Sequence, residues 1–393
     1  MIDSLPPGPI VHIDFPVGGV VATPATTVYG WIAVDGTGPL ERLRLENGRG
    51  MSVGLEVHPR LDVQQVTPGK TSTGFNGWID IRTAAHGPWY LRYEREGTEY
   101  AVDCSVSADA AEAQAFSLVK ARKLQRIREL IRCPFCRGAL TDDGPTLRCA
   151  SGHVFPVRPD AFDFLDDETR ARVGAVKTDN VSGHGYDATL DELIAQSSGP
   201  ILDVGAGNRP TYREDVINVE IVPYPTTDVI GASEYLPFAD DTFDLVISVA
   251  VLEHVRDPFA AARELERVLK PGGRIFAAVP FLQPYHAYPD HFYNMTAGGL
   301  RNLFPELDVE RLDVPQSGGP VFALTWILKA WREALSPETA AAFDRMRVAD
   351  LAVDPMLLVD SPFVRELPPA TNVQLAALNV LVGRKPNGRR KLL

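Results

Sequence analysis

The stretch ILDVGAGNRP (201–210) restricts the fold more than any other part of this sequence. A short apolar run, which is typical of a buried strand, leads directly into Gly205 and Gly207. Glycine accepts backbone conformations that other residues avoid, and its missing Cβ lets a ligand approach the main chain closely. The stretch therefore predicts either a cofactor-binding turn or a tight bend between a strand and a helix, and the segments around it decide between the two.

Apolar strands and helical patterns alternate from about residue 176 to residue 386, as in a parallel sheet covered by helices on both faces. Glu220 ends the second strand, seventeen residues after Asp203, where a carboxylate can accept hydrogen bonds from ribose hydroxyls. Only thirteen residues separate Gly207 from Ile221, so the helix between the first two strands must be short. Further strands are expected over 216–222, within 234–255, within 257–281 and over 308–314, with a final antiparallel strand over 375–386. Helices are expected at the start of 257–281, over 296–304 and over 319–335. The last helix is amphipathic and is expected to cap the active site, with a membrane surface as the alternative.

This succession resembles the class I S-adenosylmethionine-dependent methyltransferases, particularly the group of quinone and small-molecule enzymes. The matching motifs are the glycine turn, Glu220, "LPF…FDLVIS", "VLEHV" and "LKPGG". The resemblance implies a Rossmann-like, seven-stranded α/β domain over 176–386 that binds S-adenosylmethionine. The implied cofactor-binding residues are Asp203, Gly205, Ala206, Gly207, Glu220, Ser233, Glu234, Val249 and His254. One departure is that "GASEYLPF" lacks the acidic residue that the family often has before "LPF", so backbone groups near Ser233 and Glu234 are expected to hold the adenine.

The loop after the fifth strand, PFLQPYHAYPDHFYNMT (280–296), carries the candidate catalytic residues. Loops at this edge of a parallel sheet face the substrate. We expect His286 or His291 to be a general base, since a histidine suits proton transfer near neutral pH, with Asp290 orienting it. Two alternatives stay open: these side chains only shape the loop, or all three bind a divalent ion that holds a vicinal diol. His254 is expected to line the pocket floor, in a structural or a catalytic role.

Three of the four cysteines lie within seventeen residues. Cys133, Cys136, Cys149 and His153 follow the order C-x2-C, twelve residues, C-x3-H, which is the spacing of a four-coordinate Zn²⁺ site. Because the protein fills all four positions, such an ion would be structural, and it would supply much of the folding free energy of so small a segment. The segment 133–166 resembles the zinc ribbon that precedes some bacterial methyltransferase domains, including the ribosomal-RNA guanine methyltransferases.

Residues 1–106 alternate apolar and polar positions in short runs broken by Gly, Pro and Asn, which indicates an Ig-like antiparallel β-sandwich. Its aromatic residues Trp31, Trp78, Trp89 and Tyr93 are expected in the core, with a carbohydrate platform as the alternative. Residues 107–132 read as a basic helix, interpreted as a solvated linker, with RNA or another anionic partner as the alternative. The segment 387–393 is a basic tail.

The formal net charge of −12 argues against broad coating of nucleic acid. The N-terminal residues lack the pattern of a signal peptide, and the longest apolar stretch, 320–328, is too short to span a membrane, so the cytoplasm is the expected location. The stretches VYGWIAV and PRLDVQQ…TGFNGWID of the sandwich resemble β-modules appended to bacterial enzymes of surface-glycan synthesis. This resemblance implies O-methylation of a saccharide or other small-molecule acceptor. The alternatives are methylation of ribosomal or transfer RNA, methylation of a quinone, and a non-catalytic scaffold. A homo-oligomer is also left open.

Overall fold

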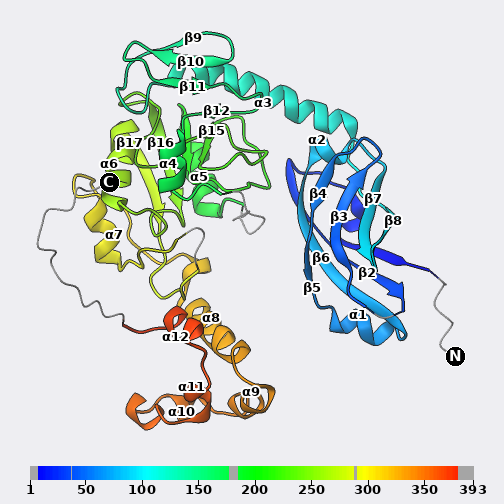
Figure 1. Ribbon diagram of the computed structural model, residues 1–393. Coiled ribbons are helices and arrows are strands. Elements are labelled where there is room, and N and C mark those ends of the chain that lie inside the picture. The colour runs from blue at the N-terminus through cyan, green and yellow to red at the C-terminus, as the bar shows by residue number, and fades with distance from the viewer. Residues whose placement is uncertain (1–7, 37, 177–184, 287–289, 379–393) are drawn as a thin grey trace, which may run out of the picture. The chain divides into compact units, whose positions relative to one another are not determined.

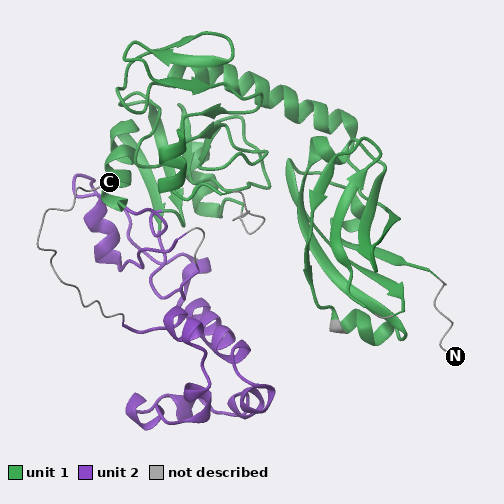
Figure 2. Ribbon diagram, viewed as in Figure 1, with its two compact units in different colours: residues 1–251, 257–278 green, residues 252–256, 279–393 purple. Residues whose placement is uncertain are grey.

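The computed structural model describes residues 8–36, 38–176, 185–286 and 290–378 of the chain (Figure 1). The chain divides into two compact units (Figure 2). The first unit comprises residues 1–251 and 257–278, and the second comprises residues 252–256 and 279–393.

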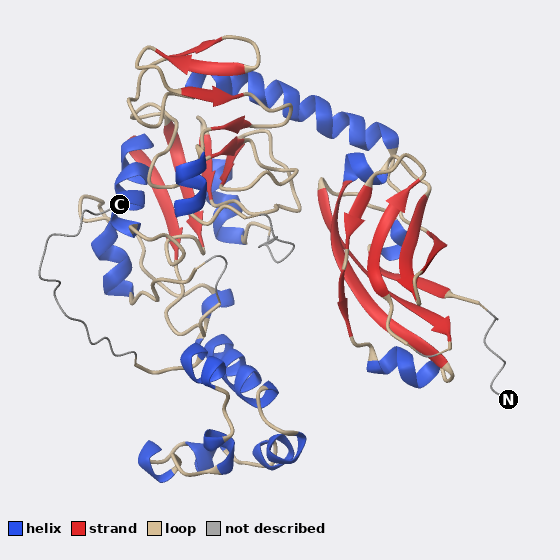
Figure 3. Cartoon of the chain, in the orientation of Figure 1, coloured by secondary structure: helices blue, strands red, loops and turns tan. Residues whose placement is uncertain are grey.

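Most of the N-terminal part of the first unit is β-strand (Figure 3). Its strands form two four-stranded antiparallel sheets, with strand orders β1-β2-β6-β5 and β4-β3-β7-β8. The first sheet comprises β1 (Ile10–Phe15), β2 (Ala25–Asp35), β5 (Glu56–His58) and β6 (Lys70–Asp80). The second sheet comprises β3 (Glu41–Asn47), β4 (Ser52–Gly54), β7 (Trp89–Arg95) and β8 (Thr98–Cys104). Short helices lie between consecutive strands: η1 (Val17–Gly19) between β1 and β2, α1 (Leu61–Val66) between β5 and β6, and α2 (Ile81–Ala84) between β6 and β7.

Inward-facing residues of both sheets share one hydrophobic core, as the alternating sequence pattern requires. Trp89 and Tyr93 lie in this core, whereas Trp31 and Trp78 are only partly buried. Trp31 stacks at a tilt on His12, with 5.6 Å between the ring centroids. The core interpretation of the aromatic residues therefore holds for two of the four.

Helix α3 (Ala110–Leu130) follows the sheets, and the side chain of Asp109 caps it by accepting hydrogen bonds from the amides of Ala111 and Glu112. Two of its basic side chains, Lys120 and Lys123, are buried, each with 1% relative exposure. The expectation of a solvated linker is therefore wrong for this face of the helix. Both lysines contact Asp228, because that buried carboxylate needs cationic partners.

The cysteine segment forms a three-stranded antiparallel sheet in the order β11-β10-β9. Its strands are β9 (Leu140–Asp142), β10 (Thr146–Cys149) and β11 (Val154–Pro156). The next strand, β12 (Phe162–Asp163), pairs in parallel with β15 of the following sheet. The expected ribbon spans residues 133–166, and its C-terminal end thus contributes β12 as an edge strand to the next sheet. The reason is that the buried apolar residues Ala161 and Leu165 pack against that sheet.

The main sheet of the first unit has six parallel strands in the order β12-β15-β14-β13-β16-β17. The remaining strands are β13 (Ile201–Val204), β14 (Val216–Glu220), β15 (Val229–Ile230), β16 (Phe243–Val249) and β17 (Leu269–Ala278), with helices α4 (Asp167–Arg172), α5 (Ala188–Gln196) and α6 (Pro258–Val268). Leu190 and Ile194 of α5 pack on β13, β14 and β16. The short helix expected after the glycine turn is not formed: residues 205–215 are turns and bends.

The second unit is helical in its described part. It comprises α7 (Ala297–Leu303), η2 (Gln316–Gly318), α8 (Pro320–Glu333), α9 (Pro337–Phe343), α10 (Val348–Leu351), η3 (Pro355–Leu357), α11 (Pro362–Arg365) and α12 (Pro369–Gln374). No helix in the described ranges is both long and apolar enough to cross a membrane.

The expected seventh strand is not found in the described part of the chain. Residues 308–314 form no strand, and their exposed side chains leave the segment without a buried face that would hold it in a sheet. Residues 375–378 of the expected final strand form no strand either, and its residues 379–386 lie outside the described ranges, as does the basic tail.

Candidate functional site

The glycine turn leaves strand β13 and is tied to strand β14 by its own main chain. The amides of Gly205 and Ala206 both donate to the carbonyl oxygen of Val219, at 2.9 and 3.1 Å. Gly205 has φ +73°, and a Cβ placed there would lie 2.2 Å from the nearest methyl carbon of Val251. Gly207 has φ +62°. The first position therefore requires glycine and the second favours it, and the turn presents bare main chain to a ligand.

Glu220 closes the turn from the neighbouring strand. Its Oε2 atom accepts a hydrogen bond from the amide of Gly207 at 2.9 Å, and its Oε1 atom accepts one from the amide of Ile221 at 2.7 Å. Burial of the carboxyl group raises the pKa of Glu220, and the two amide hydrogen bonds oppose this shift. Each carboxylate oxygen keeps a second lone pair, which a ribose hydroxyl can use.

Asp203 is fully buried and is held by two residues that the sequence reasoning did not single out. Its Oδ2 atom accepts hydrogen bonds from the Tyr186 hydroxyl at 2.7 Å and from Nε of Arg209 at 3.0 Å. Its Oδ1 atom has no hydrogen-bond partner within the described ranges. Because an unpaired buried carboxylate oxygen is costly, this atom indicates a donor from a bound ligand. The position of Arg209, directly after the glycine turn, was the available signal in the sequence.

Apart from His254, which lies in the second unit, the other predicted cofactor-binding residues stand at or just after the carboxyl ends of strands β13, β15 and β16. Ala206 is buried in the turn, and Val249 is partly buried at the last position of β16. The hydroxyl of Ser233 donates to Glu234 at 3.2 Å. Beside them, sequence reasoning missed Ser248 and Asn208, whose Oγ and Oδ1 atoms are buried without partners among the described residues. Like Oδ1 of Asp203, these oxygens can accept hydrogen bonds from a bound ligand.

The predicted histidines lie together in the second unit. The ring centroids of His286 and His291 are 4.3 Å apart, and that of His254 lies 5.1 Å from the first and 5.5 Å from the second. His254 Nδ1 lies 2.7 Å from the carbonyl oxygen of Asp290, and His286 Nδ1 lies 2.9 Å from that of Pro284. Since a carbonyl only accepts, both Nδ1 atoms carry the hydrogen, and both Nε2 atoms carry a lone pair. Burial lowers the pKa of His254.

His291 and Asp290 differ from the predicted arrangement. Nε2 of His291 lies 3.0 Å from Oδ1 of Asn294, and its Nδ1 accepts from the amide of His286 at 3.3 Å. Both ring nitrogens of His291 are therefore engaged. Asp290 reaches the cluster through its main-chain oxygen, and the ring it orients is that of His254.

Glu253 lies beside these rings, and the sequence reasoning missed it although it belongs to the quoted "VLEHV". Its side chain is fully buried, and neither carboxylate oxygen has a hydrogen-bond partner in the described part of the chain. Its Oε1 atom lies 3.8 Å from Nε2 of His254, which is too long for a hydrogen bond. Burial raises the pKa of Glu253 to about 8.

The four ribbon residues converge in the first unit. Their ligand atoms lie within 4.8 Å of one another. Nδ1 of His153 is 3.4 Å from Sγ of Cys133 and 3.3 Å from Sγ of Cys149, and the sulfurs of Cys136 and Cys149 are 3.6 Å apart. A tetrahedral Zn²⁺ with Zn–S of about 2.3 Å and Zn–N of about 2.0 Å holds such atoms about 3.5–3.8 Å apart. The residues therefore fit this ion.

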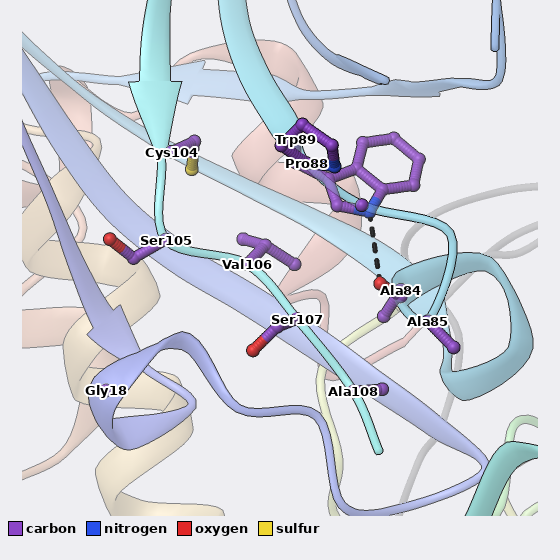
Figure 4. A pocket seen from close by; sticks show the side chains of 11 residues that line it. Gly18, Ala84, Ala85, Pro88, Trp89, Cys104, Ser105, Val106, Ser107 and Ala108 are labelled. Atoms are coloured by element: carbon purple, nitrogen blue, oxygen red, sulfur yellow. Dashed lines mark hydrogen bonds between the residues drawn. The ribbon is translucent and has the colours of Figure 1, made fainter. Parts of the chain in front are cut away.

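Two hollows in the first unit differ in their position relative to the glycine turn. The larger, of about 460 Å³, is lined by small and apolar residues around Trp89 and Cys104 (Figure 4). Figure 4 shows the indole nitrogen of Trp89 directed at the carbonyl of Ala84, 3.2 Å away, so this group is already satisfied. The smaller hollow, of about 140 Å³, is lined by Tyr186 and Arg209 beside the glycine turn. Only the smaller one adjoins residues that contact Asp203.

Comparison with known proteins finds similarity to a family, to curated relatives and to solved structures. Residues 202–277 match the methyltransferase domain family. The chain is 33% identical over 138 residues to the ubiquinone/menaquinone biosynthesis C-methyltransferase UbiE of Klebsiella pneumoniae, covering 33% of this chain and 54% of that protein. It is 47% identical over 72 residues to the uncharacterized protein YafE of Escherichia coli K12, covering 18% and 34%. The structure of YcgJ from Bacillus subtilis is similar at 20% identity with a TM-score of 0.26, covering 39% and 87%.

These matches cover only part of each protein. The chain spans about half the length of the UbiE enzymes that it matches, 51% and 54% in two of them. The family match begins at Leu202 in strand β13 and ends at Ala277 in strand β17, so it contains the glycine turn and Glu220. Residues 202–277 are therefore the part of the chain that is similar to methyltransferase domains.

Proposed function

We propose that this protein is an S-adenosylmethionine-dependent methyltransferase that acts on a hydroxyl group of a small or saccharide-like acceptor. The observation that carries the proposal is the glycine turn, whose bare main chain is closed by the Glu220 carboxylate and adjoins the unpaired oxygen of Asp203. Gly205, Ala206 and Gly207 would hold the methionine part of the cofactor. Glu220 would bind its ribose, and the backbone near Ser233 and Glu234 its adenine.

When bound, the cofactor supplies a methyl group on a positively charged sulfur, which is already activated for displacement. The protein then mainly has to align the acceptor, and alignment with desolvation can remove roughly 7–11 kcal/mol of a barrier. His286 is the proposed base, because its Nδ1–H is fixed on the Pro284 carbonyl and its Nε2 lone pair remains available. It would accept the hydroxyl proton while the acceptor oxygen bonds to the methyl carbon and the carbon–sulfur bond breaks toward sulfur.

Chain connectivity supports this assignment of the base. His254 follows the end of strand β16 by five residues, and His286 follows the end of strand β17 by eight. The segments that follow the carboxyl ends of parallel strands are where α/β proteins bind their ligands. His291 is the less favourable base, since both of its ring nitrogens already have partners.

We also propose that Cys133, Cys136, Cys149 and His153 hold a structural Zn²⁺. The distances between their ligand atoms support a tetrahedral ion, and four protein ligands leave no position for water or substrate. The ion would stabilise the three-stranded sheet and take no part in methyl transfer.

The basic sequence of helix α3 suggests an RNA acceptor, but the contacts of its side chains support this alternative only weakly. Arg122 and Arg126 lie near Glu214, and Arg128 contacts Asp142. With Lys120 and Lys123 on Asp228, much of the positive charge of α3 is matched by carboxylates of the same chain. A surface that binds RNA phosphates needs cations that are not already paired.

The proposed function is tested by calorimetric titration of the purified protein with S-adenosylhomocysteine, with bound zinc quantified on the same sample. One-to-one binding that is weakened in E220A, but not in the control E214A, supports the cofactor site. Acceptors are then screened with labelled cofactor, using glycans, quinols and RNA. A folded, zinc-loaded protein that binds no S-adenosylhomocysteine would contradict the proposal and favour a scaffold.

A further inference from the structure

The second unit contains a cluster of three potential ligands whose geometry is not explained by hydrogen bonding. One carboxylate oxygen of Glu253 and one ring nitrogen each of His254 and His286 all lie within 4.8 Å of one another. Glu253 and His254 come from the segment after β16, and His286 comes from the segment after β17. We propose that these three side chains bind one divalent first-row transition-metal ion.

Glu253 supplies the first argument. Its carboxyl group is fully buried, yet both oxygens are without a hydrogen-bond donor within the described ranges. A buried carboxylate is normally paired, hydrogen-bonded or bound to a metal. The 3.8 Å between Oε1 and Nε2 of His254 excludes a direct hydrogen bond, and a cation placed between these groups would supply the partner that Glu253 lacks.

The orientation of the two imidazoles supplies the second argument. His254 donates its Nδ1–H to the carbonyl of Asp290, and His286 donates its own to the carbonyl of Pro284. This is the usual arrangement of metal-binding histidines, in which an outer hydrogen bond fixes the tautomer and leaves the other nitrogen to coordinate. In both rings the nitrogen left to coordinate is Nε2.

The main chain fixes the two segments against each other. The carbonyl oxygen of Glu253 accepts hydrogen bonds from the amides of Phe292 and Tyr293, at 2.7 and 3.1 Å. The Tyr293 hydroxyl donates to the carbonyl of Arg256 at 3.2 Å. The ligands therefore lie on backbone that is held together without an ion. For metal–ligand distances of about 2.0–2.2 Å, their side chains need to close by only about 1 Å.

The donor set indicates which ions are suitable. Two imidazoles and one carboxylate favour Mn²⁺, Fe²⁺, Co²⁺ or Zn²⁺ over Ca²⁺ and Mg²⁺, which prefer oxygen ligands alone. Three protein ligands leave further coordination positions open, in contrast to the four-ligand cysteine site. His291 is not a ligand, because both of its nitrogens are engaged, and Asp290 contributes its carbonyl to His254 rather than its carboxylate to an ion.

The use of this ion in catalysis rests on the proposed function, whereas its binding does not. An open position would accept a hydroxyl oxygen of the acceptor, and the bound ion would lower the pKa of that hydroxyl. The proton would then leave to water, and His286 would be a ligand instead of the base. The ion-bound and ion-free cluster are thus two exclusive ways of activating the same hydroxyl.

The test uses full-length protein whose cysteine site has been loaded with zinc. Mn²⁺ is titrated by calorimetry and by electron paramagnetic resonance, because this ion is not favoured by thiolates. We expect one Mn²⁺ per chain in addition to the zinc. E253Q and H286Q should each weaken Mn²⁺ binding by at least about 100-fold, which exceeds the usual cost of losing an outer hydrogen-bond partner.

Two exposed residues give matched controls: E306Q in the same unit and H12Q in the first unit should leave Mn²⁺ binding unchanged. Circular dichroism checks that each variant is folded, and H286Q keeps the test decisive if E253Q does not fold. Absence of a second ion in folded protein, or Mn²⁺ binding that survives both E253Q and H286Q, would overturn the site. Binding of S-adenosylhomocysteine, measured on the same samples, separates this outcome from failure of the proposed methyltransferase.

Discussion

The Nζ atom of Lys123 lies 2.6 Å from the Oδ2 atom of Asp228, and neither side chain is more than 1% exposed. Lys120 approaches the other carboxylate oxygen at 3.4 Å, and the Tyr212 hydroxyl donates to that same oxygen. Lys123 also lies over the Tyr212 ring, 4.0 Å from its centroid. These contacts connect helix α3 with the segment before strand β15 inside the first unit. The helix therefore packs against the part of the first unit that matches the methyltransferase family.

Removing the Asp228 charge should destabilise the first unit strongly. D228N leaves two buried lysines without their carboxylate, and breaking a buried ion pair from one side costs about 3–5 kcal/mol. Urea unfolding measures this loss. The control is R126M, in helix α3, which removes the exposed ion pair between Arg126 and Glu214. It should lower the free energy of unfolding by at most about 1 kcal/mol. Equal effects of the two variants would show that Asp228 is not needed to fix the helix.

Alanine at Gly205 should damage both folding and cofactor binding. A side chain at positive φ costs about 1–2 kcal/mol by itself, and here the new Cβ would also overlap Val251. G272A is the matched control, because Gly272 has φ +79° but open space around its Cβ position. Thermal unfolding and S-adenosylhomocysteine titration compare the two. If G205A binds as well as G272A, close main-chain contact with the cofactor is not required.

Cofactor affinity should fall at low pH through Glu220. Ribose hydroxyls donate to the ionised carboxylate, so affinity is complete above the pKa of Glu220 and is lost as the pH falls through it. Because burial raises this pKa, the loss should begin at a higher pH than for an ordinary glutamate. E220Q should bind at least about tenfold more weakly, since a hydrogen bond to a charged group contributes about 1.5–3 kcal/mol, and its affinity should be independent of pH in this range. Titrations from pH 4 to pH 8 test this, and a wild-type affinity that does not change with pH would contradict it.

Cys104 should be unreactive in the folded protein. Burial raises the pKa of its thiol to about 12, so at pH 8 only about one molecule in ten thousand carries the reactive thiolate. Mass spectrometry after iodoacetamide treatment should find Cys104 modified only in urea. Cys136, which is exposed, provides the comparison: it should react in folded protein once a chelator has removed the proposed zinc. Rapid modification of Cys104 in the native state would mean that the sheets around it open readily.

Loss of one ribbon ligand should remove the zinc and leave the cofactor site intact. C149S leaves three of the four ligands, and we expect its zinc content, measured by plasma mass spectrometry, to fall from one ion per chain to near zero. C104S is the control and should retain the ion. Zinc retained in C149S would contradict the assignment of the four residues.

The sequence by itself determined the features that depend on local pattern. The apolar run before Gly205, the ladder of strands and helices to residue 278, and helix α3 follow from periodicity and turn residues close together in the chain. The spacing of Cys133, Cys136, Cys149 and His153 also predicted their convergence, because short turns bring such residues together. These features depend on residues that are close together in the sequence, so they can be predicted without information on distant contacts.

Only the tertiary structure decided the features that depend on distant segments. In the sequence, Lys120 and Lys123 look like part of a solvated helix face. In the structure both contact Asp228, which lies more than one hundred residues later in the chain. The segment 308–314 has a strand-like composition, but a strand forms only beside a partner, and none lies there in the described ranges. Glu253 belongs to the motif "VLEHV", which served in the sequence only as a sign of the fold. Only the structure shows that its carboxyl group is buried near His286 and has no hydrogen-bond donor within the described ranges. Burial and pairing are non-local, so they decide which polar residues are structural and which are left to bind a ligand.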